Sequence, residues 1–338
     1  MLLSKFDEWK NLLNDGTDLT FRLAGAKERI ITDSHVVQHG IDSISQQTSS
    51  LPSVRCLITG ELDTPVLLHK YIEGVKGTDK NQAPLISFND DAYCSFGKRE
   101  RRPNVKCSYA KKAAANAPIG EKGAFAYTTA LNTMLAKDSK NRLQVGDVST
   151  VAWAEKATDF EGWFVSALGE SPKDNPDAGV SAVHAIYKSI ENGAFQTDTT
   201  DGKPPRFYVL GLSPGTKKRI SIRFWVVDTV EEIAKRIKRH FDDLCIDIPP
   251  GQLKYLDLKQ LLISTAVQGK SDNIPPNLGG DTMRSILEGL PYPATLLNAA
   301  IHRLRVQRDG KKYRTQLTFV CNVVYPCTAI IKAYLNRF

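Results

Sequence analysis

Basic and aromatic side chains alternate along one short run near the middle of the chain. Residues 206–225 consist of two β-branched and aromatic runs joined by Pro214 and Gly215, a pattern that predicts a β-hairpin. Because successive strand side chains point to opposite faces, the second run should have a core face and a polar face. The expected core face carries Ile220, Ile222, Phe224 and Val226, and the expected polar face carries Arg219, Ser221, Arg223 and Trp225.

The chemistry of that polar face suits nucleic acid. Guanidinium groups offer positive charge to phosphates, and an indole offers a flat ring to a base. The alternative is an edge strand whose polar face is simply solvated. If the polar face binds nucleic acid, replacing Arg219 and Arg223 should weaken binding with little loss of fold, whereas replacing Ile222 should unfold the hairpin.

Positive charge is concentrated in two further segments. The chain carries a formal net charge of +8 and a pI of about 9.0. Residues 98–112 hold seven basic residues against Glu100, and residues 301–314 hold six against Asp309. Concentrated charge favours a binding surface for an acidic partner. The predicted nucleic-acid-binding residues are those of the first segment and of the hairpin: Lys98, Arg99, Arg101, Arg102, Lys106, Lys111, Lys112, Lys217, Lys218, Arg219, Arg223 and Trp225.

A third basic run has a structural interpretation. Apolar residues recur at helical spacing over residues 229–244, so the cations there point away from the core. Each cation has a carboxylate four residues away, which predicts a helix face of salt bridges. The expected pairs are Glu231 with Lys235, Glu232 with Arg236, Lys238 with Asp242, and Arg239 with Asp243.

Composition places the chain among ordinary globular proteins. Its 338 residues allow about two domains, and 41% are hydrophobic and 24% charged. No apolar run approaches the roughly 18 residues of a membrane span, so a cytoplasmic protein without membrane contact is expected. The cysteines lack the C-x-x-C spacing of a zinc site, so reduced thiols and no metal or other cofactor are expected. They are Cys56, Cys94, Cys107, Cys245, Cys321 and Cys327.

The order of predicted elements indicates an α+β fold, with a mixed, β-rich N-terminal portion over residues 1–228 and a mainly helical portion over residues 229–338. Strands are expected at 54–59, 85–88, 143–145 and 150–154, besides the hairpin. Helices are expected at 2–13, 124–135, 177–192, from 229 and at 330–338. Residues 314–324 could form a strand or begin the terminal helix.

Several motifs together are similar to those of a known family. They are CLITGE (56–61), LISFN (85–89), AFAYTTALN (124–132), NRLQVGD (141–147) with VAWAE (151–155), the hairpin (207–225) and IKAYLNR (331–337). In order and spacing they resemble the large subunit of the type I-C CRISPR Cascade complex. The resemblance covers most of the chain from about Phe21 onward, although family members are usually longer at both ends, so this chain is expected to be a middle piece.

The resemblance implies a non-enzymatic subunit of a crRNA-guided complex that contributes to PAM recognition, target DNA binding, R-loop stabilisation and recruitment of the helicase-nuclease. The implied partners are target double-stranded DNA and its displaced strand, crRNA, the other Cascade subunits and the helicase-nuclease. The segment 98–112 is longer and more basic than its counterpart in the family, so its role is argued from charge alone.

A metal-dependent nuclease acting on DNA is the alternative. Asp90 and Asp91 follow Asn89 on a predicted loop, where two carboxylates could hold magnesium or serve a turn. His35 and His39 are four residues apart but lack the glutamate of a zinc protease motif. A purely structural scaffold is a third possibility, and it would leave the basic segment 98–112 unexplained.

Overall fold

The computed structural model confirms the α+β class and separates the chain into two compact units. One unit comprises Met1–Val66 and Cys94–Glu121, and the other comprises Leu67–Tyr93 and Lys122–Phe338. The structure describes residues 53–66, 68–87, 117–156, 158–170, 174–175, 177–195, 204–215, 219–247, 255–308 and 323–338. The helix predicted at 2–13 lies outside these residues.

The described part of the first unit is a small hairpin. Strands β1 (Val54–Arg55) and β2 (Leu62–Asp63) pair antiparallel, and the CLITGE motif turns between them. The Cys56 N–H donates to the Glu61 carbonyl at 2.8 Å, and Gly60 closes the turn with a φ of +73°. The prediction of a strand through residue 59 is therefore wrong beyond Arg55, because the chain reverses direction there.

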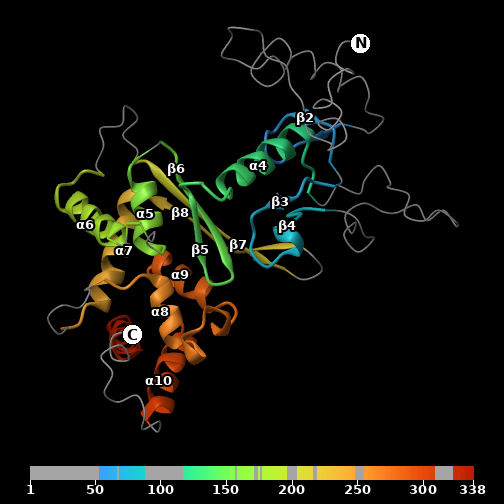
Figure 1. Cartoon of the computed structure of the whole chain (residues 1–338). Coiled ribbons are helices and arrows are strands. Elements are labelled where there is room, and N and C mark those ends of the chain that lie inside the picture. Colours follow the sequence, from blue (N-terminus) through green and yellow to red (C-terminus); the bar gives the residue numbers. More distant parts are fainter. Residues whose placement is uncertain are drawn as a thin grey trace, which may run out of the picture. The chain divides into compact units, whose positions relative to one another are not determined.

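A four-stranded antiparallel sheet organises the second unit (Figure 1). Its strands follow chain order: β5 (Arg142–Val145), β6 (Val148–Ala154), β7 (Arg206–Pro214) and β8 (Ile220–Thr229). The predicted turn at Gly146 and Asp147 joins β5 to β6, and Gly146 has a φ of +59°. The predicted hairpin is confirmed as the pair β7–β8.

Helices cover one face of this sheet, which we call the helical face. Three helices contact it, α5 (Phe160–Leu168), α7 (Val230–Leu244) and α9 (Leu278–Glu288), and α6 (Ala178–Glu191) packs against α5 and α7. In Figure 1, α5, α6 and α7 lie together beside the sheet. The rings of Phe160, Phe164 and Phe207 meet at centroid distances of 4.9 to 6.3 Å and form the middle of the main core.

A smaller layer covers part of the second face. It is built from β3 (Ile72–Glu73), the short 3-10 helix η2 (Asp79–Asn81), β4 (Gln82–Ala83) and α4 (Glu121–Met134), the predicted helix of the AFAYTTALN motif. A second core forms where it meets the sheet, from Ile72, Val75, Ala83, Leu131, Leu135, Val151, Leu210, Leu212 and Ile220. The strand predicted at 85–88 is only an isolated bridge from Ser87 to Leu68, and Phe88 lies outside the described residues.

Two motif side chains tie this layer together. Asn132 on α4 donates to the Tyr71 carbonyl at 3.1 Å and accepts from the Glu73 N–H at 2.9 Å, as a neighbouring strand would. Arg142 on β5 donates to the carbonyls of Leu135 and Gly74, each at 3.1 Å. These motif residues therefore satisfy backbone groups of the fold.

A β-bulge shifts the register between β7 and β8. Gly211 pairs with Phe224 but Leu212 pairs with Ile222, so Arg223 is the extra residue. A Cβ at position 211 would lie 2.5 Å from the Phe224 ring, so glycine allows that ring to lie over the strand. Residues before the bulge consequently point to the face opposite to the one expected from simple alternation.

The predicted core face of β8 is therefore wrong for two of its four residues. Phe224 and Val226 lie in the main core on the helical face, as expected. Ile220 instead packs in the second core, and Ile222 is 54% exposed. Because about half of the Ile222 surface is exposed, we expect its replacement to leave the hairpin folded, contrary to the expectation from alternation.

The described part after residue 229 is helical and packs on the same main core as the sheet. Besides α7 and α9 it contains α8 (Leu258–Thr265), η6 (Val267–Gly269), η7 (Ser271–Asn273), α10 (Ala294–Arg308) and α12 (Tyr325–Asn336). Residues 323–324 already belong to a helical turn, and residues 309–322 lie outside the described part. The division of function at residues 228 and 229 stays a prediction. No described helix has both the length and the apolar character that crossing a membrane requires.

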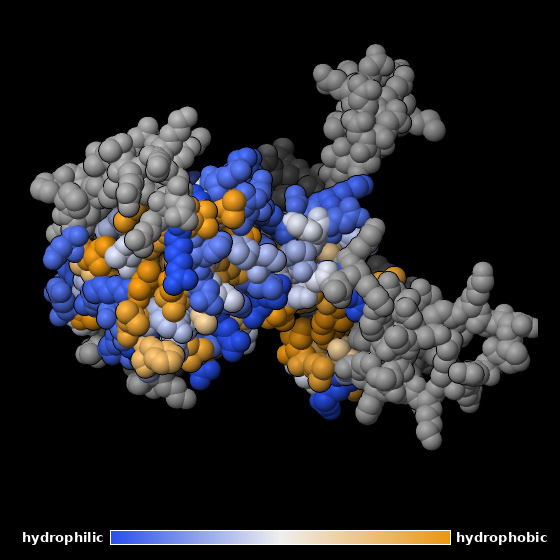
Figure 2. Space-filling view, turned by 90° about the horizontal axis from the view of Figure 1, so that it is seen from below, coloured by the Kyte–Doolittle hydropathy of each residue, from blue (hydrophilic) through white to orange (hydrophobic). Residues whose placement is uncertain are grey.

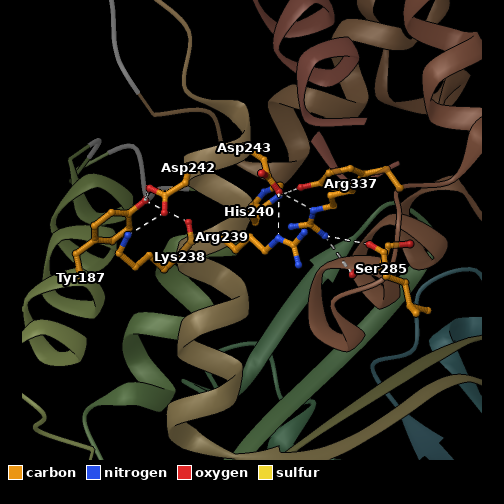
Figure 3. Close-up of polar contacts among 10 residues, drawn as sticks. Tyr187, Lys238, Arg239, His240, Asp242, Asp243, Ser285 and Arg337 are labelled. Carbon is orange, nitrogen blue, oxygen red and sulfur yellow. Dashed lines mark hydrogen bonds and ion pairs between the residues drawn. The ribbon is translucent and has the colours of Figure 1, made fainter. Parts of the chain in front are cut away.

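A buried polar cluster joins α12 to α7 and α9, and we call it the Arg337 cluster (Figure 3). The Arg337 guanidinium, 2% exposed, pairs with Asp243 at 2.6 Å and donates to the carbonyls of Ser285 and Leu290. It also lies 4.2 Å from the ring centre of Tyr292. The Tyr292 hydroxyl in turn lies 2.6 Å from Nδ1 of His240, so the cluster contains this histidine as well.

Candidate nucleic-acid interface

The predicted site residues fall into two groups. Nine of them, Lys98, Arg99, Arg101, Arg102, Lys106, Lys111, Lys112, Lys217 and Lys218, lie outside the described residues. So do Asp90 and Asp91 of the nuclease alternative. The structure positions the other three, Arg219, Arg223 and Trp225, on or beside β8.

The two arginines have partners within the chain. Arg219 donates through Nη2 to the Ser87 carbonyl at 2.8 Å, just before β8 begins. Arg223, the bulge residue, donates through Nε to the Ser213 hydroxyl at 2.8 Å and through Nη2 to the Asn277 side chain beside α9. Its guanidinium also lies 3.8 Å from Asp147. The guanidinium of Arg223 therefore contributes to packing at the helical face.

Trp225 lies on the other face of the sheet from Arg223. It pairs in register with Leu210, a residue of the second core, and 49% of its surface is exposed. The prediction that Arg223 and Trp225 share one polar face is therefore wrong, and the bulge between β7 and β8 is the reason. A ligand stacked on Trp225 would meet other neighbours than the expected arginines.

Those neighbours are two further aromatic rings, and we call Trp153, Tyr208 and Trp225 the aromatic platform. Trp153 on β6 pairs in register with Tyr208 on β7, and the two rings stack at a centroid distance of 5.4 Å and an angle of 13°. Trp225 lies 5.6 Å from Trp153 and 5.9 Å from Tyr208. Three rings from three adjacent strands thus meet on the second face.

The sequence contained Trp153 and Tyr208 in its motifs, but their contact could not be found there. Alternation shows that Trp153 and Tyr208 each occupy one face of their strands, but only the pairing register brings the two rings opposite each other. The useful signal would have been an aromatic residue in each of three strands predicted to be neighbours.

The surroundings of the platform combine apolar and charged groups. Ile222 and Val227, 54% and 37% exposed, lie on the same face of β8. Arg206 is exposed at the start of β7, two residues before Tyr208, and Glu155 directly follows the neighbouring strand β6, two residues after Trp153. Figure 2 shows one face of the molecule, on which hydrophilic residues predominate and hydrophobic residues gather in separate patches.

Three of the four cations of α7 pair with carboxylates of the same helix, as the spacing predicted. Lys235 pairs with Glu231 at 2.9 Å and Lys238 with Asp242 at 2.8 Å, while Arg239 reaches Asp243 at 4.0 Å. Thr229 caps the helix by accepting from the Glu232 N–H, so the start of α7 is also as expected.

The fourth predicted pair on α7 is wrong. Arg236 does not pair with Glu232 but with Asp228 at 2.6 Å, and it also donates to the Leu287 carbonyl on α9 at 2.7 Å. Glu232 pairs instead with Lys235 at 2.9 Å. The tertiary structure offers Arg236 two acceptors that a helix-only pattern cannot show, so this cation holds α7 to its surroundings.

Only part of the second basic segment is described. Arg303 on α10 is half-buried and close to Cys327 of α12, whereas Arg305 is exposed. Residues 309–322, which include the remaining cations after Arg308, lie outside the described part. Arg303 is therefore placed for packing between α10 and α12, and Arg305 for contact with solvent or a partner.

A histidine and a tyrosine outside the aromatic platform have displaced pKa values. Burial, together with the positive charge of Arg337, lowers the pKa of His240 to about 3. Burial raises the pKa of Tyr127 on α4 to about 12, and this hydroxyl lies 2.6 Å from Nδ1 of His69. Among the described residues no three or more histidine, cysteine, aspartate and glutamate side chains gather as metal ligands would.

These features define an α+β protein whose sheet is covered by helices on one face and carries three aromatic rings on the other. The chain belongs to the CRISPR-associated protein family Cas_Csd1, whose sequence profile matches residues 3–338. This match confirms the CRISPR association that the motifs predicted. A comparison with curated proteins gave no match. The expectation that the chain is a middle piece of longer relatives stays a prediction.

Proposed function

We propose that this chain is a non-catalytic large subunit of a crRNA-guided type I-C Cascade complex. In this role it contributes to PAM recognition, target DNA binding and R-loop stabilisation, and it helps to recruit the helicase-nuclease. Residues 1–228 supply the nucleic-acid contacts, and residues 229–338 form a mainly helical portion. The partners are target DNA with its displaced strand, crRNA, the other Cascade subunits and the helicase-nuclease, all in the cytoplasm.

The observation that carries the proposal is the family match over residues 3–338. The net charge of +8 supports it, because the protein of an RNA-guided complex holds strands by their backbones while base pairing reads the sequence. The aromatic platform adds a surface that could receive unpaired bases. No catalytic group is needed for any of these tasks.

Assembly tests the proposed class of protein. The chain is co-expressed with the other complex subunits and crRNA, and the products are separated by size-exclusion chromatography. We expect the chain to co-elute with the RNA-containing complex. A chain that stays apart from the complex under all salt conditions would contradict the proposed role.

Salt dependence tests the basic segment. In the assembled complex Lys98, Arg99, Arg101 and Arg102 are replaced together by alanine, and DNA affinity is measured across a salt series. Because each phosphate contact releases counterions, we expect the slope of log affinity against log salt to flatten by roughly 2–4. An unchanged slope would remove this segment from the interface.

Incubation with magnesium or manganese and labelled DNA tests the nuclease alternative. The proposed function predicts intact DNA. Metal-dependent cleavage that disappears when Asp90 and Asp91 are replaced by asparagine would overturn the non-catalytic assignment.

A further inference from the structure

We propose that the aromatic platform of Trp153, Tyr208 and Trp225 is a stacking site for unpaired nucleobases of a single strand. This inference rests on the proposed nucleic-acid-binding function and adds a site, a ligand class and a direction of approach. The ligand approaches the second face of the sheet, beyond the part that α4, β3 and β4 cover.

The platform exposes more aromatic surface than packing of the fold requires. Trp153 packs against the second core at one edge, but Trp225 keeps 49% of its surface exposed. Val227, which pairs in register with Tyr208, is also exposed. An exposed apolar cluster beside polar residues often marks a surface that a ligand covers.

The chemistry of the three rings suits stacking with nucleobases. Sheets that bind single strands present aromatic side chains on which bases stack, and this stacking tolerates any sequence because every base has a π-face. The platform offers three such rings from three adjacent strands within 6 Å of each other. Tyr208 and Trp225 are tilted by 31° relative to each other, so a base stacked on one ring would lie at an angle to the other.

The exposed area of the platform suits one or two bases better than a protein partner. Aromatic side chains bury about 150–250 Å² each when fully covered, so three partly covered rings expose on the order of 300 Å². A stable protein interface needs about 800 Å² on each partner. The platform is therefore too small to be a protein interface by itself, whereas one or two bases would cover it.

Two charged side chains of opposite sign lie at the edge of the platform. Arg206 is exposed on the same face, two residues before Tyr208, and could meet the phosphate of a stacked nucleotide. Glu155 directly follows β6, and its carboxylate accepts from the Arg206 backbone N–H at 3.4 Å. Because Glu155 partly offsets Arg206, stacking should supply most of the binding at this spot, and the bases rather than the phosphates should be decisive.

The test distinguishes binding through the bases from binding through the phosphates. The full 338-residue chain is titrated with a single-stranded oligothymidine of about 10 nucleotides and with an abasic strand of equal length and charge. Binding is followed by tryptophan fluorescence and by anisotropy of a label on the strand. We expect the oligothymidine to quench fluorescence and to bind more tightly than the abasic strand.

Substitutions on β8 show whether the Trp225 ring is responsible for the binding of bases. Trp225→Ala should weaken oligothymidine binding roughly 5- to 150-fold, the range that one stacked base provides, and should leave abasic binding unchanged. Trp225→Phe should restore most of the affinity. The matched control is Ile222→Ala, which removes exposed apolar surface from the same face without removing a ring, and it should change neither affinity. Far-UV circular dichroism checks that each variant keeps its fold.

The outcomes distinguish the site from the proposed function. Equal, salt-sensitive binding of both strands would overturn the platform and leave a phosphate-binding subunit. Equal losses from Trp225→Ala and Ile222→Ala, or loss of subunit assembly without loss of oligothymidine binding, would overturn it in favour of a protein contact. If neither strand binds, both the platform and the nucleic-acid-binding role fail.

Discussion

The Arg337 cluster and the aromatic platform belong to the same compact unit but satisfy opposite requirements. In the Arg337 cluster a charged side chain is 2% exposed and is surrounded by Asp243, two backbone carbonyls and the Tyr292 ring. In the platform, apolar rings that could have been covered remain in contact with solvent. Buried polar groups here stabilise the fold, whereas the exposed rings leave apolar surface that a ligand could cover.

Breaking the Arg337 cluster should cause the largest loss in the free energy of unfolding. Arg337→Ala would leave Asp243 buried without its main partner, and losing one partner of a buried pair costs about 3–5 kcal/mol. We expect that loss in the free energy of unfolding, measured by urea denaturation. Oligothymidine binding by the folded variant should be unchanged.

The matched control is Arg284→Ala on α9. Arg284 pairs with Glu288 at 2.9 Å on the helix surface, where solvent screens the pair, so stability should barely change. Equal losses for Arg337→Ala and Arg284→Ala would show that the buried cluster has no special weight.

The bulge gives a second contrast, between the two large apolar side chains that flank Arg223 on β8. Phe224 is 4% exposed in the main core, so Phe224→Ala should cost about 3–5 kcal/mol. Ile222 is 54% exposed, so Ile222→Ala should change stability by less than about 1 kcal/mol. Comparable losses at both positions, measured by the same denaturation, would mean that β8 follows simple alternation without a bulge.

Acid should weaken the Arg337 cluster through His240. Its pKa in the folded protein is about 3, below the ordinary value of 6.5, so between these values the unfolded chain binds a proton that the folded chain does not. This histidine's contribution to stability is therefore lost as the pH falls below about 6.5, at up to about 1.4 kcal/mol per pH unit.

The comparison with His240→Gln isolates that contribution. Between about pH 6.5 and 4.5 the wild-type protein should lose about 2 kcal/mol more than this variant. Thermal or urea unfolding of both proteins at each pH measures the difference. Parallel pH profiles would show that the imidazole is protonated inside the folded protein.

Sequence reasoning predicted those parts of the fold whose patterns are local. The β7–β8 hairpin, α4, α6 and α7 follow from alternation, helical spacing and turn residues, and all lie where expected. The bulge could not be predicted, because it depends on the Phe224 ring lying over Gly211 of the neighbouring strand. The α5 helix, in a segment without a strong local pattern, was missed.

The candidate site shows the same limit. The sequence predicted a binding role for Trp225, but its neighbours depend on strand register, which brings Trp153 and Tyr208 to it and carries Arg223 to the helical face. On α7, the pairs within the helix were predicted, but Arg236 found its acceptors in Asp228 and in Leu287 of another helix. Contacts between elements are set by tertiary packing, which one sequence does not reveal.

We expect the smallest change in DNA binding from cations that are neutralised by neighbouring carboxylates in the structure. Lys235 and Lys238 pair with Glu231 and Asp242, so they present little net charge to a polyanion. Replacing both with alanine should leave the salt slope of DNA binding unchanged, whereas the four substitutions in the segment 98–112 should flatten it. Both variants are measured in the assembled complex with the same salt series. A flatter slope for the α7 variant would show that phosphates displace the carboxylates on binding, and the helix would then join the interface despite its internal pairs.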